Sequence, residues 1–267
     1  MAVFDPAYFR DQGWWRDETL GDWINRCAAT SPDRAAILTG DRALTYQALR
    51  SDVTSLAAGL ARAGMQRGDV VVVHLPNLPE FLIAWLAINA LGAVMQTVHT
   101  PYGILELEHL IAHGGGKAAI ALARTKARSP AGDIVSLRER LPELRLVIAV
   151  GGEVPGAIAF SAVLAEGHGK PPLGPADAND PFLLLYTSGT TSSPKAVSVS
   201  SNHFLSNARR NSACGRMIEF CALRPTRICM VFMLWSSGSR LARPPVCSMC
   251  SRPPVSSRRS NGQSPPS

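Results

Sequence analysis

The feature that most constrains the fold of this chain is a regular alternation of short strand-like runs with longer helix-like segments. Four consecutive valines, residues 70–73, form a β-branched run of the kind that occupies strands buried on both faces of a sheet. Further strands are predicted at 35–38, 43–44, 94–98, 118–122, 146–150 and 182–186, and helices at 46–60, 80–91 and 105–113. This alternation predicts an α/β fold of layered, largely parallel sheets covered by helices.

Local signals support individual elements of this pattern. Residues 35–44 have the apolar–turn–apolar pattern of a β-hairpin, and Thr45 directly after it is a typical helix N-cap. Gly64 and Gly92 follow helical segments, where glycine commonly ends a helix. The segment 151–180 is rich in Gly, Pro, Ala and Asp, so we expect a surface connection there.

Hydropathy and the composition of the N-terminus predict a cytoplasmic protein without a membrane-spanning segment. Hydrophobic residues make up 46% of the chain, enough for a sizeable core. The longest apolar stretch at a predicted helix, residues 81–91, is well short of the ~20 residues needed to cross a bilayer. Residues 1–21 carry four acidic side chains and lack the apolar region of a secretory signal.

Charge is distributed very unevenly along the chain. The net charge is +7, yet residues 1–208 hold 17 Lys+Arg and 19 Asp+Glu, whereas residues 209–267 hold 10 Arg and a single acid, Glu219. The same tail contains 11 Ser, 7 Pro and five of the six Cys, and no Asp, Lys or Tyr. We therefore predict two parts, 1–208 and 209–267. Because the basic character belongs to the second part alone, we expect no nucleic-acid partner for the chain.

A hydroxyl-rich segment with a glycine and a lysine directly follows the strand predicted at 182–186. It reads Thr-Ser-Gly-Thr-Thr-Ser-Ser-Pro-Lys over residues 187–195. Hydroxyls and turn amides donate hydrogen bonds to phosphate oxygens, a glycine lets the backbone approach, and a lysine neutralises charge. The candidate phosphate-binding residues are Thr187, Ser188, Gly189, Thr190, Thr191 and Lys195.

Two other interpretations of this segment compete with a phosphate site. A Walker A loop requires G-x-x-x-x-G-K-[ST], whereas Pro194 stands at the second glycine position here and Ala196 follows the lysine. The simpler alternative is a Ser/Thr-rich surface loop without a ligand, which composition by itself would favour. The length and order of the motif favour the phosphate site.

The segment 185–195 resembles the signature loop of the AMP-forming synthetase/ligase family, which includes acyl-CoA synthetases, luciferases and the adenylation domains of peptide synthetases. Three further segments resemble the family in its order and spacing: 44–49, 68–80 and 90–94. The resemblance covers about residues 15–208 and implies the fold of the N-terminal subdomains of acyl-adenylate-forming ligases, in incomplete form. Residues 13–23 are similar to the opening of aryl- or alicyclic-acid and fatty-acid ligases. The resemblance to acyl-CoA synthetases as a whole implies a place in fatty acid metabolism.

The resemblance implies ATP-dependent activation of a small-molecule carboxylic acid. The carboxylate attacks the α-phosphate of Mg-ATP to give acyl-AMP and pyrophosphate, and a thiol, commonly that of coenzyme A (CoA), then takes the acyl group. The implied cofactors are therefore ATP, Mg and CoA. In this scheme the hydroxyls of residues 187, 188, 190 and 191, together with Lys195, hold the β- and γ-phosphates.

Several functional segments of the family have no counterpart in this sequence. They are the aromatic-histidine segment of the acyl pocket, a Tyr/Gly/Thr/Glu motif, the ribose-binding aspartate and the C-terminal domain with its catalytic lysine. Because residues 209–267 contain no Asp and no Lys, we predict no catalytic residue and no metal ligand in this chain. It is expected to be a truncated ligase that does not turn over. The alternative is a nonenzymatic fragment with at most weak nucleotide binding.

The signature loop also departs from the family pattern. Glycine is usual at the positions of Ser192 and Ala196, and a serine held at positive φ costs about 1 kcal/mol. A histidine common in relatives is replaced by Ser201, with His203 two residues further on. We therefore expect weakened phosphate binding.

The tail 209–267 has four interpretations. A zinc site at Cys247-x-x-Cys250 lacks a histidine in the tail and matches no common spacing, and a nucleic-acid-binding arm lacks Lys and interleaved aromatics. A native disordered tail fits the Ser and Pro content but not the apolar run 228–235. Translation of GC-rich DNA in a shifted frame accounts for the Arg, Ser, Pro and Cys together. This hypothesis fails if neither other frame of the coding DNA restores family-like sequence.

Four histidines are scattered over the predicted elements without metal-ligand spacing. We expect each of His74, His99, His109 and His113 to be a surface residue or an interior residue with satisfied hydrogen bonds. The three glycines 114–116 are predicted to form a helix-to-strand turn rather than a phosphate loop, because no helix begins after them.

Overall fold

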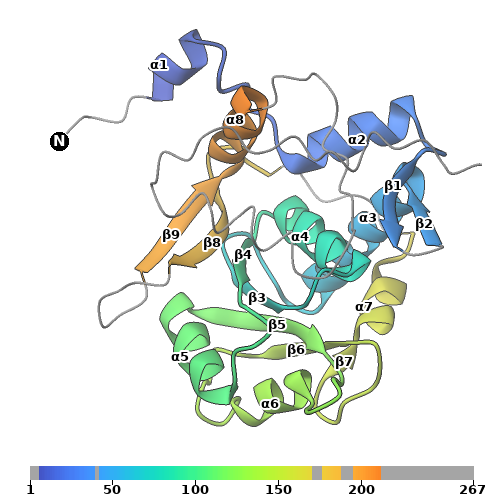
Figure 1. Ribbon diagram of the computed structural model, residues 1–267, viewed down its shortest axis with the longest axis vertical. Coiled ribbons are helices and arrows are strands. Elements are labelled where there is room, and N and C mark those ends of the chain that lie inside the picture. The colour runs from blue at the N-terminus through green and yellow to red at the C-terminus, as the bar shows by residue number, and fades with distance from the viewer. Residues whose placement is uncertain (1–5, 40–41, 170–175, 188–194, 212–267) are drawn as a thin grey trace, which may run out of the picture.

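A computed structural model of the chain describes residues 6–39, 42–169, 176–187 and 195–211. Within these residues seven strands form one sheet in the order β7-β6-β5-β3-β4-β8-β9 (Figure 1). They are β3 (Val70–His74), β4 (Val94–Thr97), β5 (Gly116–Leu122), β6 (Leu146–Val150), β7 (Ile158–Ala159), β8 (Pro181–Thr187) and β9 (Lys195–Ser200). Neighbouring strands are parallel except β9, which is antiparallel to β8. The largely parallel sheet predicted from the sequence is confirmed.

Helices cover both faces of this sheet (Figure 1). One face carries α2 (Leu20–Thr30), α3 (Tyr46–Arg62), α4 (Pro79–Leu91) and α7 (Phe160–Gly167), and the other carries α5 (Ile104–Gly114) and α6 (Pro130–Ser136). Successive side chains of a strand point to opposite faces. Val71 and Val73 therefore belong to the first core and Val72 to the second, and all three are completely buried. This is why the strand has no polar position between its valines.

The predicted helix ends and turns agree with the structure. β1 (Ala35–Thr39) and β2 (Arg42–Thr45) form the expected antiparallel hairpin. Thr45 Oγ then accepts a hydrogen bond from the backbone N–H of Ala48 (3.2 Å) at the start of α3. Gly92 ends α4 with φ +75°, a left-handed conformation that favours glycine. α5 ends at Gly114 and β5 begins at Gly116, as expected for a helix-to-strand turn.

The segment 151–180, which is predicted to contain a surface connection, also contains β7 and α7. α7 crosses α3 at backbone contact. A Cβ added at Gly167 would lie 1.7 Å from the carbonyl oxygen of Ser55, and one at Gly59 would lie 2.1 Å from the carbonyl oxygen of Val163. Gly167, one of the small residues that suggested a loop, is therefore required by helix packing. No helix in the described ranges is long and apolar enough to span a membrane.

Candidate functional site

The candidate phosphate-binding segment, residues 187–195, begins at the last residue of β8 and ends at the first residue of β9, and these two strands pair side by side and antiparallel (Figure 1). Thr187 and Lys195 face each other in the register of this hairpin, at the last described pair before the turn. Since β8 is parallel to β4, the turn lies at the carboxyl end of the strands, where α/β sheets commonly bind ligands. The other predicted phosphate ligands, Ser188, Gly189, Thr190 and Thr191, lie outside the described residues.

β8 continues past the end of its neighbour β4. β8 pairs with β4 only at Met95↔Leu183 and Gln96↔Leu184, whereas its pairing with β9 continues to Thr187. The first four residues of β9, 195–198, are exposed and only its last two are buried. The sequence analysis did not predict β9. The alternation of Val197 and Val199 with Ala and Ser was the signal that could have identified it.

A hydrogen bond holds the end of β8 to α5. The Tyr186 hydroxyl lies 2.9 Å from His113 Nδ1, and the two rings meet edge to face with centroids 5.6 Å apart. Burial raises the pKa of Tyr186, so its hydroxyl keeps its proton at neutral pH. It donates to Nδ1 in the histidine tautomer that carries the proton on Nε2. Sequence reasoning missed this pair, since the two residues are 73 positions apart.

The opposite end of the hairpin, where β8 begins and β9 ends, is closed by two asparagines. Asn179 precedes β8, and Asn202 is the second residue of α8 (Ser201–Asn211), which follows β9 directly. The side-chain Nδ2 of Asn202 donates to Asn179 Oδ1 (3.0 Å), and its backbone N–H donates to the carbonyl of Ala178 (3.0 Å). Because Asn202 is only 2% exposed, these hydrogen bonds are shielded from water.

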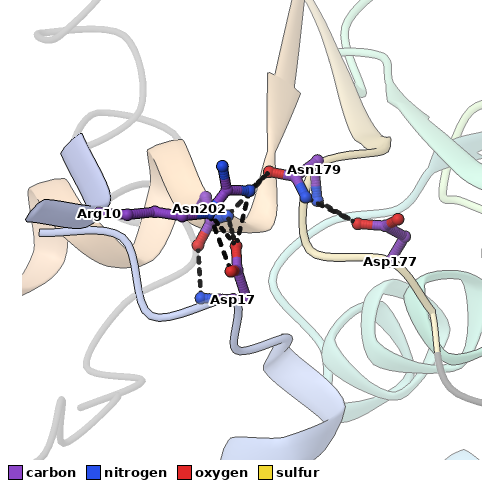
Figure 2. A network of polar contacts seen from close by, with 5 residues as sticks. All are labelled: Arg10, Asp17, Asp177, Asn179 and Asn202. Carbon is purple, nitrogen blue, oxygen red and sulfur yellow. Dashed lines mark hydrogen bonds and ion pairs between the residues drawn. The ribbon is translucent and has the colours of Figure 1, made fainter. Parts of the chain in front are cut away.

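The N-terminal segment joins the same network through Asp17 (Figure 2). Asp17 Oδ1 accepts from Asn202 Nδ2 (2.7 Å), and the backbone N–H of Asp17 donates to Asn202 Oδ1 (3.1 Å). Arg10 in α1 (Pro6–Asp11) donates to Asp17 Oδ2 (3.0 Å) and to Asn179 Oδ1 (3.2 Å). The hydrogen bond from Arg10, and then the one from Asn202, lower the pKa of Asp17. These bonds also hold Asp17 at φ +52°, a value uncommon outside glycine.

Comparison with known proteins decides the family. A family model described as "AMP-binding enzyme" matches residues 24–238. The chain belongs to this family. The family resemblance predicted from the motif 185–195 and the segments before it is therefore confirmed.

The relatives of this chain include acyl-CoA ligases and synthetases. Protein Y of Streptomyces griseus is 36% identical over 203 residues, which cover 72% of this chain and 65% of that protein. Triostin synthetase I of Streptomyces triostinicus is 33% identical, with 71% of this chain and 34% of that protein covered. The medium-chain fatty-acid–CoA ligase of Escherichia coli K12 is 28% identical, and the match covers 79% of this chain and 38% of the ligase. The chain thus spans less than two thirds of each of these relatives.

Solved structures of adenylate-forming ligases share the fold. The apo structure of Mycobacterium smegmatis MbtA has a TM-score of 0.68 at 28% sequence identity. The matched region covers 79% of this chain and 39% of the MbtA chain. Acetoacetyl-CoA synthetase from Streptomyces lividans has a TM-score of 0.63 at 29% sequence identity, and the match covers 72% of this chain and 31% of the synthetase. The predicted α/β fold of the N-terminal part of such ligases is confirmed.

Ser201, which the family resemblance aligns with a histidine, is built into the core. Ser201 is completely buried, and its Oγ accepts from Asn89 Nδ2 of α4 at 3.5 Å. His203, the nearby histidine, instead has its Nδ1 2.9 Å from Ser200 Oγ and its ring edge-on to Trp15 at 5.1 Å. Burial lowers the pKa of His203. Ser201 and His203 both stabilise the start of α8, which follows the hairpin.

His74 does not fit its prediction as a surface or satisfied interior residue. It ends β3, is 2% exposed, and neither ring nitrogen has a hydrogen-bond partner of ordinary geometry among the described residues. Burial, with a contribution from Arg128, lowers the pKa of His74 to about 4, and the backbone of Val98 opposes this effect. Within the described ranges, no three potential metal ligands of the His, Cys, Asp and Glu types lie together.

Proposed function

We propose that this chain carries the ATP phosphate-binding hairpin of an acyl-adenylate-forming ligase. The observation that supports the proposal is the pairing of Thr187 with Lys195 at the carboxyl edge of the sheet, which brings the two ends of the hydroxyl-rich turn together. An ammonium group beside several hydroxyls fits the negative charge and the hydrogen-bonding capacity of a polyphosphate.

The hairpin acts on the half of ATP that leaves. A carboxylate oxygen of the acid attacks the α-phosphorus, the bond from the α-phosphorus to the bridging oxygen breaks, and pyrophosphate departs with the electron pair. The hydroxyls of residues 187, 188, 190 and 191 donate to oxygens of the β- and γ-phosphates, and Lys195 compensates the charge that develops on them. Mg enters with ATP and needs no protein ligand in this part of the chain.

The substrate class is a small-molecule carboxylic acid, with CoA as the acyl acceptor. Relatives named medium-chain fatty-acid–CoA ligase and feruloyl-CoA synthase support both assignments. Ser192 and Ala196 stand where the family usually has glycine, so we propose that the loop binds phosphate less tightly than that of a typical relative.

Binding of Mg-ATP to the full chain tests this function, with isothermal titration calorimetry as the measurement. We expect Lys195→Ala to weaken binding about 10-fold or more, because a hydrogen bond to a charged group contributes about 1.5–3 kcal/mol. Lys126→Ala removes an exposed lysine on another loop and should leave the affinity unchanged.

Two outcomes would count against the proposal. One is a folded parent chain that takes up no Mg-ATP at all, and the other is a Lys195→Ala chain that binds as tightly as the parent. Either result would favour the alternative, a nonenzymatic fragment without a functional phosphate site.

A further inference from the structure

Two exposed histidines stand one helical turn apart on α5. The rings of His109 and His113 lie with centroids 6.2 Å apart and planes tilted by 33°. Residues i and i+4 of a helix share one face, and this is the spacing of the two histidines in helical zinc sites. We propose that His109 and His113 form a binding site for a divalent transition-metal ion, with the Tyr186 hydroxyl orienting His113. The site does not depend on the proposed function, and it departs from the prediction of no metal ligand, which overlooked this spacing.

The separation of the two rings is close to that of two imidazoles bound to one ion. With a metal–nitrogen bond of about 2.0–2.1 Å, a ring centroid lies about 3.2 Å from the ion, so a tetrahedral angle places two centroids about 5 Å apart. The rings of His109 and His113 therefore need to approach each other by about 1 Å. Because both side chains are exposed, small rotations about their χ angles achieve this without a change in the core.

Tyr186 holds one half of the site in position. Its hydroxyl lies 2.9 Å from His113 Nδ1, and its ring packs against the core cluster that includes Leu107 and Leu110 of α5. A metal-binding histidine almost always donates a hydrogen bond from its other ring nitrogen, which sets the tautomer and the direction of the ring. When Nε2 of His113 binds the ion, the imidazole proton lies on Nδ1 and is donated to the Tyr186 oxygen, since a phenol oxygen accepts as well as donates.

The other coordination positions of the ion are open to water. In the part of the chain that the structure describes, no three His, Cys, Asp or Glu side chains are grouped to hold one ion. The nearest acids along α5 are engaged elsewhere: Glu106 Oε2 accepts from the backbone N–H of Gly103 (3.0 Å), and Glu108 pairs with Arg140 (3.0 Å). Two imidazole ligands favour Ni²⁺, Cu²⁺ or Zn²⁺ over Mg²⁺ and Ca²⁺, which prefer oxygen ligands.

Titration of the full chain with Ni²⁺, measured by calorimetry, tests the site. The six cysteines are first alkylated with iodoacetamide, because thiolates would compete for the ion. We expect one saturable Ni²⁺ site in the parent and the loss of that site in His109→Gln and in His113→Gln. Tyr186→Phe keeps the ring packing but removes the acceptor oxygen, so it should weaken Ni²⁺ binding about 10-fold, as expected for the hydrogen-bond partner of a metal ligand.

His168→Gln is the matched control, because His168 is exposed and has no histidine one helical turn away in the sequence. It should bind Ni²⁺ as the parent does. Acylation of histidines by diethylpyrocarbonate, mapped by mass spectrometry, gives a second measurement: Ni²⁺ should protect His109 and His113 but not His168. Similar melting temperatures of all chains without metal exclude unfolding as the cause of lost binding.

Three results would contradict the proposal. An unchanged Ni²⁺ affinity in either variant of His109 or His113 would overturn the site, and so would acylation of the pair at the same rate with and without Ni²⁺. A Tyr186→Phe chain that binds Ni²⁺ as tightly as the parent would overturn the orienting role of Tyr186.

Discussion

At the scale of single residues, His74 gives the sharpest pH dependence. Burial and Arg128 lower its pKa from 6.5 to about 4. As pH falls below 6.5, His74 becomes protonated in the unfolded chain but stays neutral in the folded chain. The contribution of His74 to the free energy of unfolding is therefore fully present above pH 6.5 and is lost as pH falls toward 4. The loss is about 3 kcal/mol at 1.36 kcal/mol per pKa unit. We expect His74→Met to abolish most of it, as measured by urea unfolding at about pH 7 and about pH 4.5. Parallel losses in the variant and the parent would contradict this.

The candidate site combines residues that can be predicted from the sequence with contacts that cannot, for a physical reason. Thr187 and Lys195 belong to one short segment, so their residue types and spacing were enough to predict them. The bond between Tyr186 and His113 joins residues far apart in the sequence, and the unsatisfied state of His74 depends on what surrounds it in three dimensions. Such contacts exist only once the strand order is known.

At the scale of elements, the crossing of α3 and α7 is the most sensitive contact between helices. A methyl group at Gly167 would meet the carbonyl oxygen of Ser55 at 1.7 Å, and backbone cannot move aside as a side chain can. We expect Gly167→Ala to lower the free energy of unfolding by about 3 kcal/mol, measured by urea unfolding. Gly21→Ala is the matched control, because this glycine of α2 has only Thr19 Oγ nearby, at 3.5 Å. It should be neutral or slightly stabilising. Equal effects of the two changes would contradict the packing argument.

Elements with a strong hydrophobic period were predicted well, and elements with a weak one were not. β3 and α4 were evident from their apolar runs. α7 was missed because one of its buried positions is Gly167, and a buried glycine lowers the contrast between its faces. The bounds of α2 were not predicted, although Thr19 and Asp22 form a capping box, a signal that could have identified its start.

At the scale of the whole molecule, the class of the sheet followed from the sequence but its strand order did not. Alternating strands and helices imply a parallel sheet, whereas the neighbours of each strand depend on contacts between distant segments. Lys117 Nζ at the start of β5 lies 2.6 Å from Asp69 Oδ1 just before β3, which helps hold these two strands side by side. The antiparallel edge strand β9 was also missed, and it forms one arm of the candidate site.

The whole chain is expected to catalyse no acid-dependent exchange of labelled pyrophosphate into ATP. Exchange requires the acid and the α-phosphate to be held together, whereas the proposed role of the hairpin is to hold only the phosphates that leave. The ribose-binding aspartate and the catalytic lysine of the family have no counterpart in residues 209–267, which contain no Asp and no Lys. The measurement uses a panel of aliphatic and aromatic acids, with Lys195→Ala as the control for contaminating enzymes. Exchange that depends on the acid and disappears in Lys195→Ala would show that this chain turns over, and the prediction would then be wrong.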